Sequence, residues 1–179
     1  MTTSPAITIE KLDATACAPY GVMLGTPPRA DDPSTFLSPQ SDFWRAQLFE
    51  TGDTAAEILW VVYREQPLSV STLEAHHLTQ QAVVPLTGSI IQILATSDDE
   101  GNPDLRTLRA FEIKQGQGLC MYARTWHATR VRKGETACLM LTRASTTRDL
   151  ATSLRDARLP VETVLCHIDA FSLHQAVAS

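Results

Sequence analysis

The sequence lacks the features that would place it in several special classes of protein. Its four cysteines, Cys17, Cys120, Cys138 and Cys166, stand singly with no C-x-x-C pair, which argues against a thiolate zinc site and a disulfide framework. We expect reduced thiols, most of them buried as small apolar side chains. No run of Lys or Arg occurs and the net charge is −5, so nucleic acid is not an expected partner.

Long apolar runs and targeting signals are also missing. The longest apolar stretch, 58–63, is far too short to cross a bilayer, and residues 1–4 lack the basic and apolar regions of a secretory signal. These absences predict no membrane partner and a cytoplasmic location. The composition is otherwise ordinary, with 44% apolar and 20% charged residues in 179, which is typical of one compact globular domain.

Short β-type segments follow one another at nearly regular spacing after a breaker-rich loop at 25–39. The segments are 42–49, 57–64, 81–86, 90–95, 107–113, 118–122 and 137–142. Turn residues such as Thr87-Gly88-Ser89 and Lys133-Gly134 separate them. Many short strands at this spacing are typical of an all-β barrel or sandwich, and a jelly roll removes most open sheet edges.

One helix is expected near the end of the chain. Thr146 is a candidate cap, apolar residues follow at helical spacing, and Pro160 ends the pattern. A last strand is expected at 161–168. The sequence therefore predicts a single domain over 1–179, in which 1–40 form an N-terminal strand and loop, 42–143 the barrel, and 146–179 the helix and last strand.

Polar residues recur at a spacing similar to that of the two short patterns shared by cupin barrels. The first pattern is represented by Glu74-x-His76, four residues, Gln81, six residues and Gly88. The second is represented by Gly116, five residues, Tyr122-x-Arg124, two residues and His127. This resemblance implies a cupin-type double-stranded β-helix, that is, a jelly-roll barrel with a short C-terminal helix.

The first pattern has a physical reason. Alternate residues of a strand share a face, so Glu74 and His76 point the same way, and side chains from elsewhere in the barrel can complete the cluster. We expect four members: Glu74, His76, Gln81 and His127. A carboxylate, two imidazoles and an amide suit a divalent metal such as nickel, zinc, manganese or iron better than calcium. The alternative is that the imidazoles simply form hydrogen bonds in a polar barrel mouth, and His77 replaces His76 if the register slips by one.

Five stretches together resemble the ureidoglycolate lyase family. They are Leu73-Glu74-Ala75-His76, Gln81 to Leu86, Pro103 to Phe111, Gly116-Gln117-Gly118 and Trp126-His127. The resemblance implies a homodimeric cupin that cleaves ureidoglycolate to glyoxylate and urea in allantoin (purine) catabolism, with nickel as the metal. Two alternatives remain open: a cupin enzyme acting on another small 2-hydroxy or 2-oxo acid, and a non-catalytic cupin that binds a small carboxylate.

Lyase chemistry requires a base for the substrate hydroxyl and an acid for the leaving nitrogen. The candidate bases are His127 and Glu74, and the candidate acids are Tyr122 and His76. The carboxylate of the substrate needs a cation, and Arg124 is expected on the same strand face as Tyr122. The other candidate substrate-binding residues are Arg109, Gln81 and Trp126, the last as a wall of the pocket.

Overall fold

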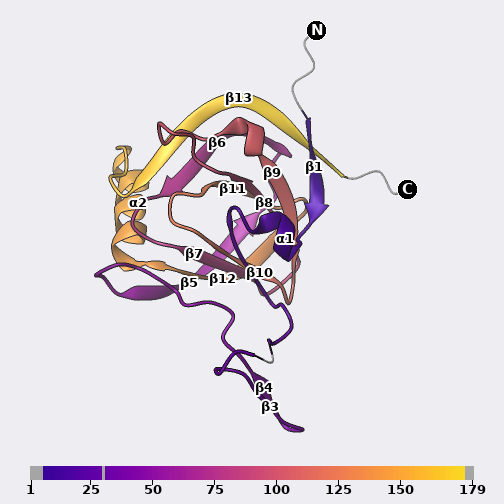
Figure 1. Cartoon of the computed structure of the whole chain (residues 1–179). Helices are drawn as coiled ribbons and strands as arrows, with labels where there is room; N and C mark the ends of the chain where they lie inside the picture. The colour runs from indigo at the N-terminus through magenta and orange to yellow at the C-terminus, as the bar shows by residue number, and fades with distance from the viewer. Residues whose placement is uncertain (1–5, 30, 176–179) are drawn as a thin grey trace.

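The computed structural model describes residues 6–29 and 31–175. Its strands are β1 (Ala6–Lys11), β2 (Gly21–Leu24), β3 (Phe36–Leu37), β4 (Asp42–Phe43), β5 (Ala56–Arg64), β6 (Ser69–His76), β7 (Gln81–Pro85), β8 (Ser89–Ala95), β9 (Arg109–Lys114), β10 (Gly118–Met121), β11 (Trp126–Arg130), β12 (Glu135–Arg143) and β13 (Thr163–Gln175). The helices are α1 (Ala14–Cys17), α2 (Ala144–Asp156) and a 3-10 turn, η1 (Leu105–Thr107). Strands therefore dominate the described chain (Figure 1).

The eight strands from β5 to β12 pair in a nested order. β8 pairs with β9, β7 with β10, β6 with β11 and β5 with β12, all antiparallel. These pairs form two sheets, one with the order β2-β10-β7-β12-β5 and one that closes through β1-β13-β6-β11-β8-β9. Such a hairpin rolled into two sheets is a jelly roll. The prediction of an all-β jelly-roll barrel with a short C-terminal helix is confirmed.

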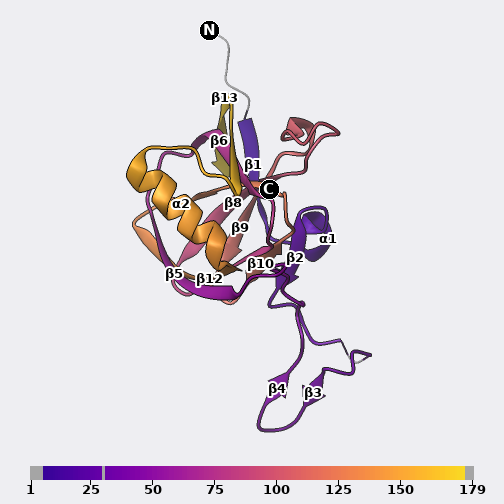
Figure 2. The ribbon, with the colours of Figure 1, turned by 90° about the vertical axis from the view of Figure 1, so that its left-hand side faces the viewer.

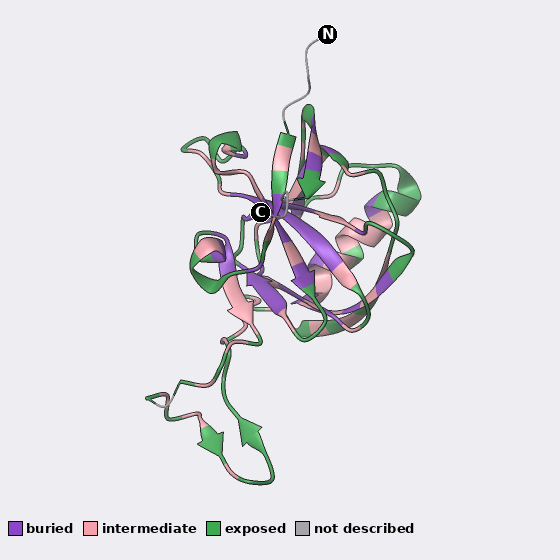
Figure 3. Ribbon diagram, turned by 90° about the vertical axis from the view of Figure 1, so that its right-hand side faces the viewer, coloured by how far each residue is buried: buried purple, intermediate pink, exposed green. Residues whose placement is uncertain are grey.

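Strand β8 carries apolar residues on both faces, and these residues belong to two separate buried clusters (Figure 3). Ile90 and Leu94 of β8 join the cluster that lies between the two sheets, together with residues of β7, β10 and β12. Ile91 and Ile93 join the second cluster, which only the closed sheet and its flanking segments enclose. Because adjacent strand residues point to opposite faces, β8 is apolar on both faces, apart from Ser89 and the buried Gln92.

The expected turn at Thr87-Gly88-Ser89 connects β7 and β8. Gly88 has φ +58°, and a Cβ there would lie 2.9 Å from the Thr136 hydroxyl oxygen. Only glycine takes this left-handed conformation without strain, so the turn residue is required by the hairpin. All four cysteines are free, and three of them are buried, as expected. Within the described ranges no helix has the length and apolar character needed to cross a membrane.

Several local expectations are wrong. Only Asp42–Phe43 of the expected strand 42–49 belongs to a strand, and it pairs with β3 in a small hairpin that stands away from the barrel (Figure 2). Residues beyond Phe43 have no neighbouring strand, so no ladder forms there. Conversely, β6 and β11 are absent from the strands that the sequence predicts by their ranges. Only the strand position of Glu74 and His76 agrees with the prediction.

The end of the chain also differs in detail from the expectation. Helix α2 begins at Ala144, so Thr146 lies inside it, and its hydroxyl donates to the Glu162 carboxylate at 2.6 Å instead of capping the helix. The helix ends at Asp156, before Pro160, and the residue that follows it, Ala157, has a φ of +50°. The last strand runs from Thr163 to Gln175 because it pairs with β6 over much of its length.

Candidate functional site

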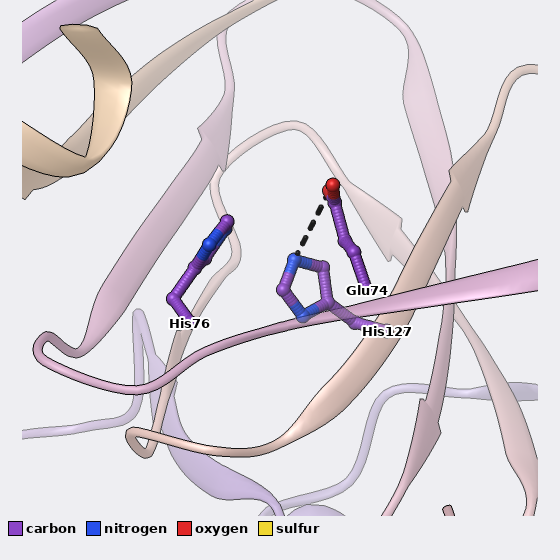
Figure 4. Close-up of side chains that lie close together, drawn as sticks. All are labelled: Glu74, His76 and His127. Atoms are coloured by element: carbon purple, nitrogen blue, oxygen red, sulfur yellow. Dashed lines mark ion pairs between the residues drawn. The ribbon is translucent and has the colours of Figure 1, made fainter. Parts of the chain in front are cut away.

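Glu74 and His127 are direct partners across the β6 and β11 ladder, and theirs is the only residue pair of that ladder. Both side chains point to the space between the two sheets, where Nε2 of His127 lies 3.4 Å from Oε1 of Glu74 (Figure 4). His127 is buried and Glu74 is half-buried. The jelly roll thus brings together two residues that lie more than 50 positions apart.

His76 and Gln81 complete this cluster. His76 follows Glu74 by two positions on β6, and its ring centroid lies 5.1 Å from that of His127. The Gln81 amide nitrogen, on β7, lies 3.1 Å from Nε2 of His76. One ligand atom each from Glu74, His76 and His127 can be chosen so that all lie within 4.8 Å of one another. All four residues expected at the metal site therefore meet in one place.

A main-chain carbonyl determines the tautomer of His127. Nδ1 lies 2.9 Å from the carbonyl oxygen of Thr125, which can only accept a hydrogen bond, so Nδ1 carries the proton. Nε2 then presents a lone pair, and it has no hydrogen-bond partner among the described residues. A lone pair that faces a carboxylate oxygen at 3.4 Å needs a proton or a cation between the two atoms.

The pKa shifts in the cluster give it the charges that a metal site needs. Burial, followed by the nearby charge of His127, lowers the pKa of His76 to about 4, so this ring is neutral at pH 7. Burial acts to raise the pKa of Glu74, but the favourable interaction of the carboxylate with the neighbouring His127 and His76 rings outweighs it and leaves that pKa below its usual value. Glu74 is therefore ionised at neutral pH.

These observations together define a candidate metal site at Glu74, His76 and His127. Neutral imidazole and carboxylate are ligands that first-row divalent metals accept. The bare lone pair on His127 is an independent sign that the donor set fits such an ion. Thr163 accepts or donates a 2.9 Å hydrogen bond at Nδ1 of His76, which holds the ring with Nε2 toward the cluster.

A cavity of about 360 Å³ opens beside the cluster and under helix α2. Its lining residues are Leu59, Val61, Tyr63, Glu74, His76, Gln81, Met140, Thr142, Thr146, Thr147, Leu150 and Leu154. The walls are mostly apolar, and Glu74, His76 and Gln81 contribute polar groups from β6 and β7. That volume and that polarity are typical of a pocket for a small organic molecule.

Glu74 also borders a second, shallower depression of about 270 Å³ together with His127 and Tyr63. Among the residues that the structure describes, Arg130 is the only Arg or Lys that lines either of these two spaces. Its guanidinium already donates to the carbonyl oxygens of Ser69 and Thr129. Within 6–29 and 31–175, no Arg or Lys lines the larger cavity under α2.

The expected neighbours Tyr122 and Arg124 lie elsewhere. β10 ends at Met121, and Tyr122 to Thr125 form a turn closed by the 3.2 Å hydrogen bond from the Thr125 amide to the Tyr122 carbonyl. Arg124 has φ +69° in this turn, so the expectation that it shares a strand face with Tyr122 is wrong. Both side chains are exposed and line a depression with Thr96 and Ser97, apart from Glu74.

Arg109 and Trp126 also point away from the cluster. The Arg109 guanidinium forms an ion pair with Glu10 and donates to the Ala16 carbonyl, which joins β9 to the N-terminal segment. Trp126 is buried in the second core, because it precedes His127 on β11 and adjacent strand residues face opposite sides. Neither residue lines the cavity under α2.

Sequence reasoning missed three residues of this site. Thr125 and Thr163 orient the two imidazoles, and Thr163 is 87 positions away from His76, so no local pattern could have indicated it. Tyr63 lines both spaces beside Glu74. Burial raises its pKa, so its hydroxyl stays protonated. The alternation of β5, with Leu59, Val61 and Tyr63 on one face, was the available signal for Tyr63.

A jelly-roll barrel with two histidines and a carboxylate converging inside it defines a cupin-type protein with a candidate metal centre. Two solved structures align with it at low similarity: the QdtA 3,4-ketoisomerase from Thermoanaerobacterium thermosaccharolyticum, in complex with TDP (12% identity, 62% of this chain and 75% of that chain, TM-score 0.39), and a mutant oxalate decarboxylase from Bacillus subtilis (11% identity, 62% and 33%, TM-score 0.39).

Sequence comparison is more specific than these structural likenesses. The family model described as ureidoglycolate lyase matches residues 4–162. A ureidoglycolate lyase of Chelativorans sp. is 31% identical over 133 residues, which are 72% of this chain and 79% of that protein. A ureidoglycolate lyase of Escherichia coli is 40% identical over 62 residues, which are 34% of this chain and 38% of that protein. The chain belongs to the ureidoglycolate lyase family.

Proposed function

We propose that this protein cleaves ureidoglycolate to glyoxylate and urea, as a carbon-nitrogen lyase of purine catabolism. The observation that carries the proposal is the lone pair of His127 Nε2 facing the Glu74 carboxylate, which lines the cavity under α2. Family membership supplies the substrate class. The cavity of about 360 Å³ is large enough for a molecule of this size.

The reaction moves one proton within the substrate. The hydroxyl loses its proton as its oxygen becomes the aldehyde of glyoxylate, the carbon-nitrogen bond breaks, and the departing nitrogen gains a proton to become urea. No water is consumed. One carboxylate can take the proton from oxygen and return it to nitrogen, and Glu74 is ionised at neutral pH and suited to this part. His76 has a pKa of about 4, so its ring is not protonated at neutral pH and does not supply the proton as the acid.

The metal ligands in this proposal are His76, His127 and one oxygen of Glu74, with Gln81 beside them. A divalent ion bound there supplies Lewis acidity, which favours loss of the hydroxyl proton and offers positive charge to the substrate. We propose nickel first, because the family resemblance implies it. Because a carboxylate has two oxygens, Glu74 could hold the ion through one of them and carry the proton on the other, which would divide the ligand role and the base role between two atoms.

The remaining groups of the cavity bind and orient the substrate in this proposal. Tyr63 stays protonated because burial raises its pKa, and it therefore donates a hydrogen bond to the ureido group as charge develops there. The substrate carboxylate meets no Arg or Lys in the lining of this cavity. A divalent ion held by His76, His127 and Glu74 would supply a counter-charge, and Arg124 and Arg109 have no part in binding in this proposal.

A glyoxylate-release assay with racemic ureidoglycolate tests the function. Purified protein is treated with chelator, dialysed, and assayed with and without added nickel or manganese. Metal-dependent release by the wild type and not by Glu74→Gln is the expected result. Absence of release under every metal condition contradicts the proposal and favours another small acid as substrate. Tight binding of glycolate or lactate without turnover indicates a carboxylate-binding cupin.

The homodimer implied by the family resemblance and a cytoplasmic location belong to the same proposal. Sedimentation of the purified protein tests the first of these. Fractionation of cells that express the full chain tests the second. A monomeric protein, or one recovered outside the cytoplasm, contradicts the corresponding part.

A further inference from the structure

Two buried polar atoms on the inner face of the five-stranded sheet lack a hydrogen-bond partner. They are Oγ1 of Thr142 and Oε1 of Glu57, and neither makes a hydrogen bond with any residue that the structure describes. Thr142 lies on β12 and Glu57 on β5, and the two are partners in the ladder that joins these strands. Ladder partners point to the same face, so the two side chains lie beside each other.

This pair belongs to the side of the sheet that borders the cavity under α2. Thr142 is buried, with 2% of its surface exposed, and it is one of the residues that line the cavity. Leu59 and Val61, two and four positions after Glu57 on β5, line the same cavity. Alternate strand residues share a face, so Glu57 points to the same side of the sheet. The two unpartnered atoms are therefore next to the space where the substrate is proposed to bind.

The pair also continues a row of polar groups that starts at the candidate metal site. The Gln81 amide nitrogen lies 3.1 Å from Nε2 of His76. Leu141 pairs with Ala82, so one step further along this antiparallel ladder Thr142 lies opposite Gln81. Neighbouring strands are about 5 Å apart, so Thr142 is about one strand spacing from Gln81. A small substrate held at the metal site can therefore reach the Thr142 hydroxyl with its other end.

Unpartnered polar atoms in a buried place destabilise the free protein, because each has lost its hydrogen bonds to water without a replacement. Valine has nearly the shape of threonine, so packing alone does not require the hydroxyl of Thr142. A bound molecule that supplies hydrogen bonds to these atoms removes the cost. A carboxylate oxygen only accepts a hydrogen bond, whereas a hydroxyl accepts or donates. The chemical group that fits both atoms is therefore one with two N–H donors.

We propose that Thr142 and Glu57 bind the terminal amino group of the ureido substituent and make the site selective for a carbamoyl group over an acyl group of the same size. This inference rests on the proposed function, because it places the substrate carboxylate at the metal site. One N–H of the amino group donates to Oε1 of Glu57 and the other to Oγ1 of Thr142. An acetyl group carries a methyl group in this place and leaves both atoms unpartnered. Sites that form hydrogen bonds to a substrate N–H strongly reject an analogue without it.

Two unreactive analogues test this subsite by calorimetry, without turnover. N-carbamoylglycine is ureidoglycolate without its hydroxyl, and N-acetylglycine has a methyl group in place of the terminal amino group. The wild-type protein supplied with nickel is expected to bind N-carbamoylglycine at least about 10-fold more tightly than N-acetylglycine. Thr142→Val and Glu57→Met should each bring the two affinities within about threefold, by weakening the binding of N-carbamoylglycine alone. Thr142→Ser keeps the hydroxyl and should keep the preference.

Thr136→Val is the matched control. Thr136 is also 2% exposed on the same face of β12, but its hydroxyl donates to the Ser89 carbonyl at 3.0 Å and it does not line the cavity. This variant should keep the ligand preference and lower the urea midpoint of unfolding, because it breaks that hydrogen bond. Thr142→Val should keep or raise the midpoint of the ligand-free protein. A fall as large as that of Thr136→Val would show that the Thr142 hydroxyl has a partner within the chain and would overturn the proposal.

Glyoxylate release from ureidoglycolate, measured on the same preparations, separates this inference from the proposed reaction. A wild type that releases glyoxylate but binds both analogues equally contradicts the subsite and leaves the reaction in place. A wild type that prefers N-carbamoylglycine yet releases no glyoxylate supports the subsite and contradicts the reaction. Binding of neither analogue, or a preference that survives both Thr142→Val and Glu57→Met, overturns the subsite.

Discussion

His127 and Glu74 face each other across a single ladder position, and the ring is oriented so that its unprotonated nitrogen points to the carboxylate. The Thr125 carbonyl produces this orientation by accepting the Nδ1 proton. Two electron-rich atoms at this distance repel each other unless a proton or metal ion lies between them. The proposed chemistry therefore depends on a main-chain carbonyl as well as on the two side chains.

Replacing His127 by Ala is expected to lower kcat/KM for ureidoglycolate at least 100-fold, because it removes a metal ligand and the partner of Glu74. Glyoxylate release measures this effect. His77→Ala serves as the control, since His77 follows His76 and lines a depression apart from the cavity under α2. Near wild-type activity of His127→Ala would end the assignment of the site.

Thr163→Val is expected to weaken metal binding about 10- to 100-fold, because Nδ1 of His76 loses the hydrogen bond that orients the ring. Isothermal titration of nickel into metal-free protein gives the affinity directly. Thr72→Val is the matched control, because the Thr72 hydroxyl contacts the exposed His167 at 3.0 Å. Equal affinities for the two variants would show that Thr163 does not position His76.

Arg124→Ala and Arg109→Ala are expected to keep kcat/KM within about threefold of the wild type, since neither side chain lines the cavity beside Glu74. Arg109→Ala should lower the free energy of unfolding by about 1 kcal/mol, because it removes a partly exposed ion pair and a hydrogen bond to the main chain. Urea unfolding measures this loss. A tenfold rise in KM for either variant would return that arginine to the substrate site.

Tyr63→Phe is expected to lower kcat about 10- to 100-fold with a smaller change in KM, since a hydrogen bond that strengthens in the transition state acts mainly on kcat. The fold should persist, because the ring and its apolar contacts remain. Steady-state glyoxylate release, with circular dichroism as the check on folding, separates the two effects. An unchanged kcat would remove Tyr63 from the mechanism.

The metal-free protein should lose stability as the pH falls from about 6.5 to about 4. The pKa of His76 is about 4 in the folded protein and near 6.5 when unfolded, so the unfolded chain binds the extra proton in this window. From pH 7 to pH 5 this residue alone accounts for a loss of about 2 kcal/mol.

Urea unfolding of wild type and His76→Asn at both pH values isolates that contribution. The variant should lose less stability than the wild type by this amount. Above pH 7 the contribution of His76 is complete, so a further rise in pH should leave the difference unchanged. Identical pH dependence in the two proteins would mean that the folded ring titrates near its ordinary pKa.

Much of the fold and part of the site could be predicted from the sequence, because both depend on local rules. Alternating apolar residues and turn residues such as Gly88 predicted short strands and an all-β barrel. The two-residue spacing of Glu74 and His76 put both side chains on one face whatever the rest of the chain does. His76 was accordingly preferred to His77, and His76 is the one that joins the cluster.

The tertiary structure alone decided the rest. His127 lies opposite Glu74 because of the register between two distant strands, and Thr163 meets His76 because β13 pairs with β6 and the two residues are partners in that ladder. Arg124 lies outside the site because it adopts a left-handed backbone conformation in its turn. The two-residue spacing between Tyr122 and Arg124 does not predict this conformation. Sequence by itself determined which face each strand residue takes, since that follows from a period of two. Pairing register and turn conformation arise from packing between remote segments, so only the folded chain determined which polar groups meet.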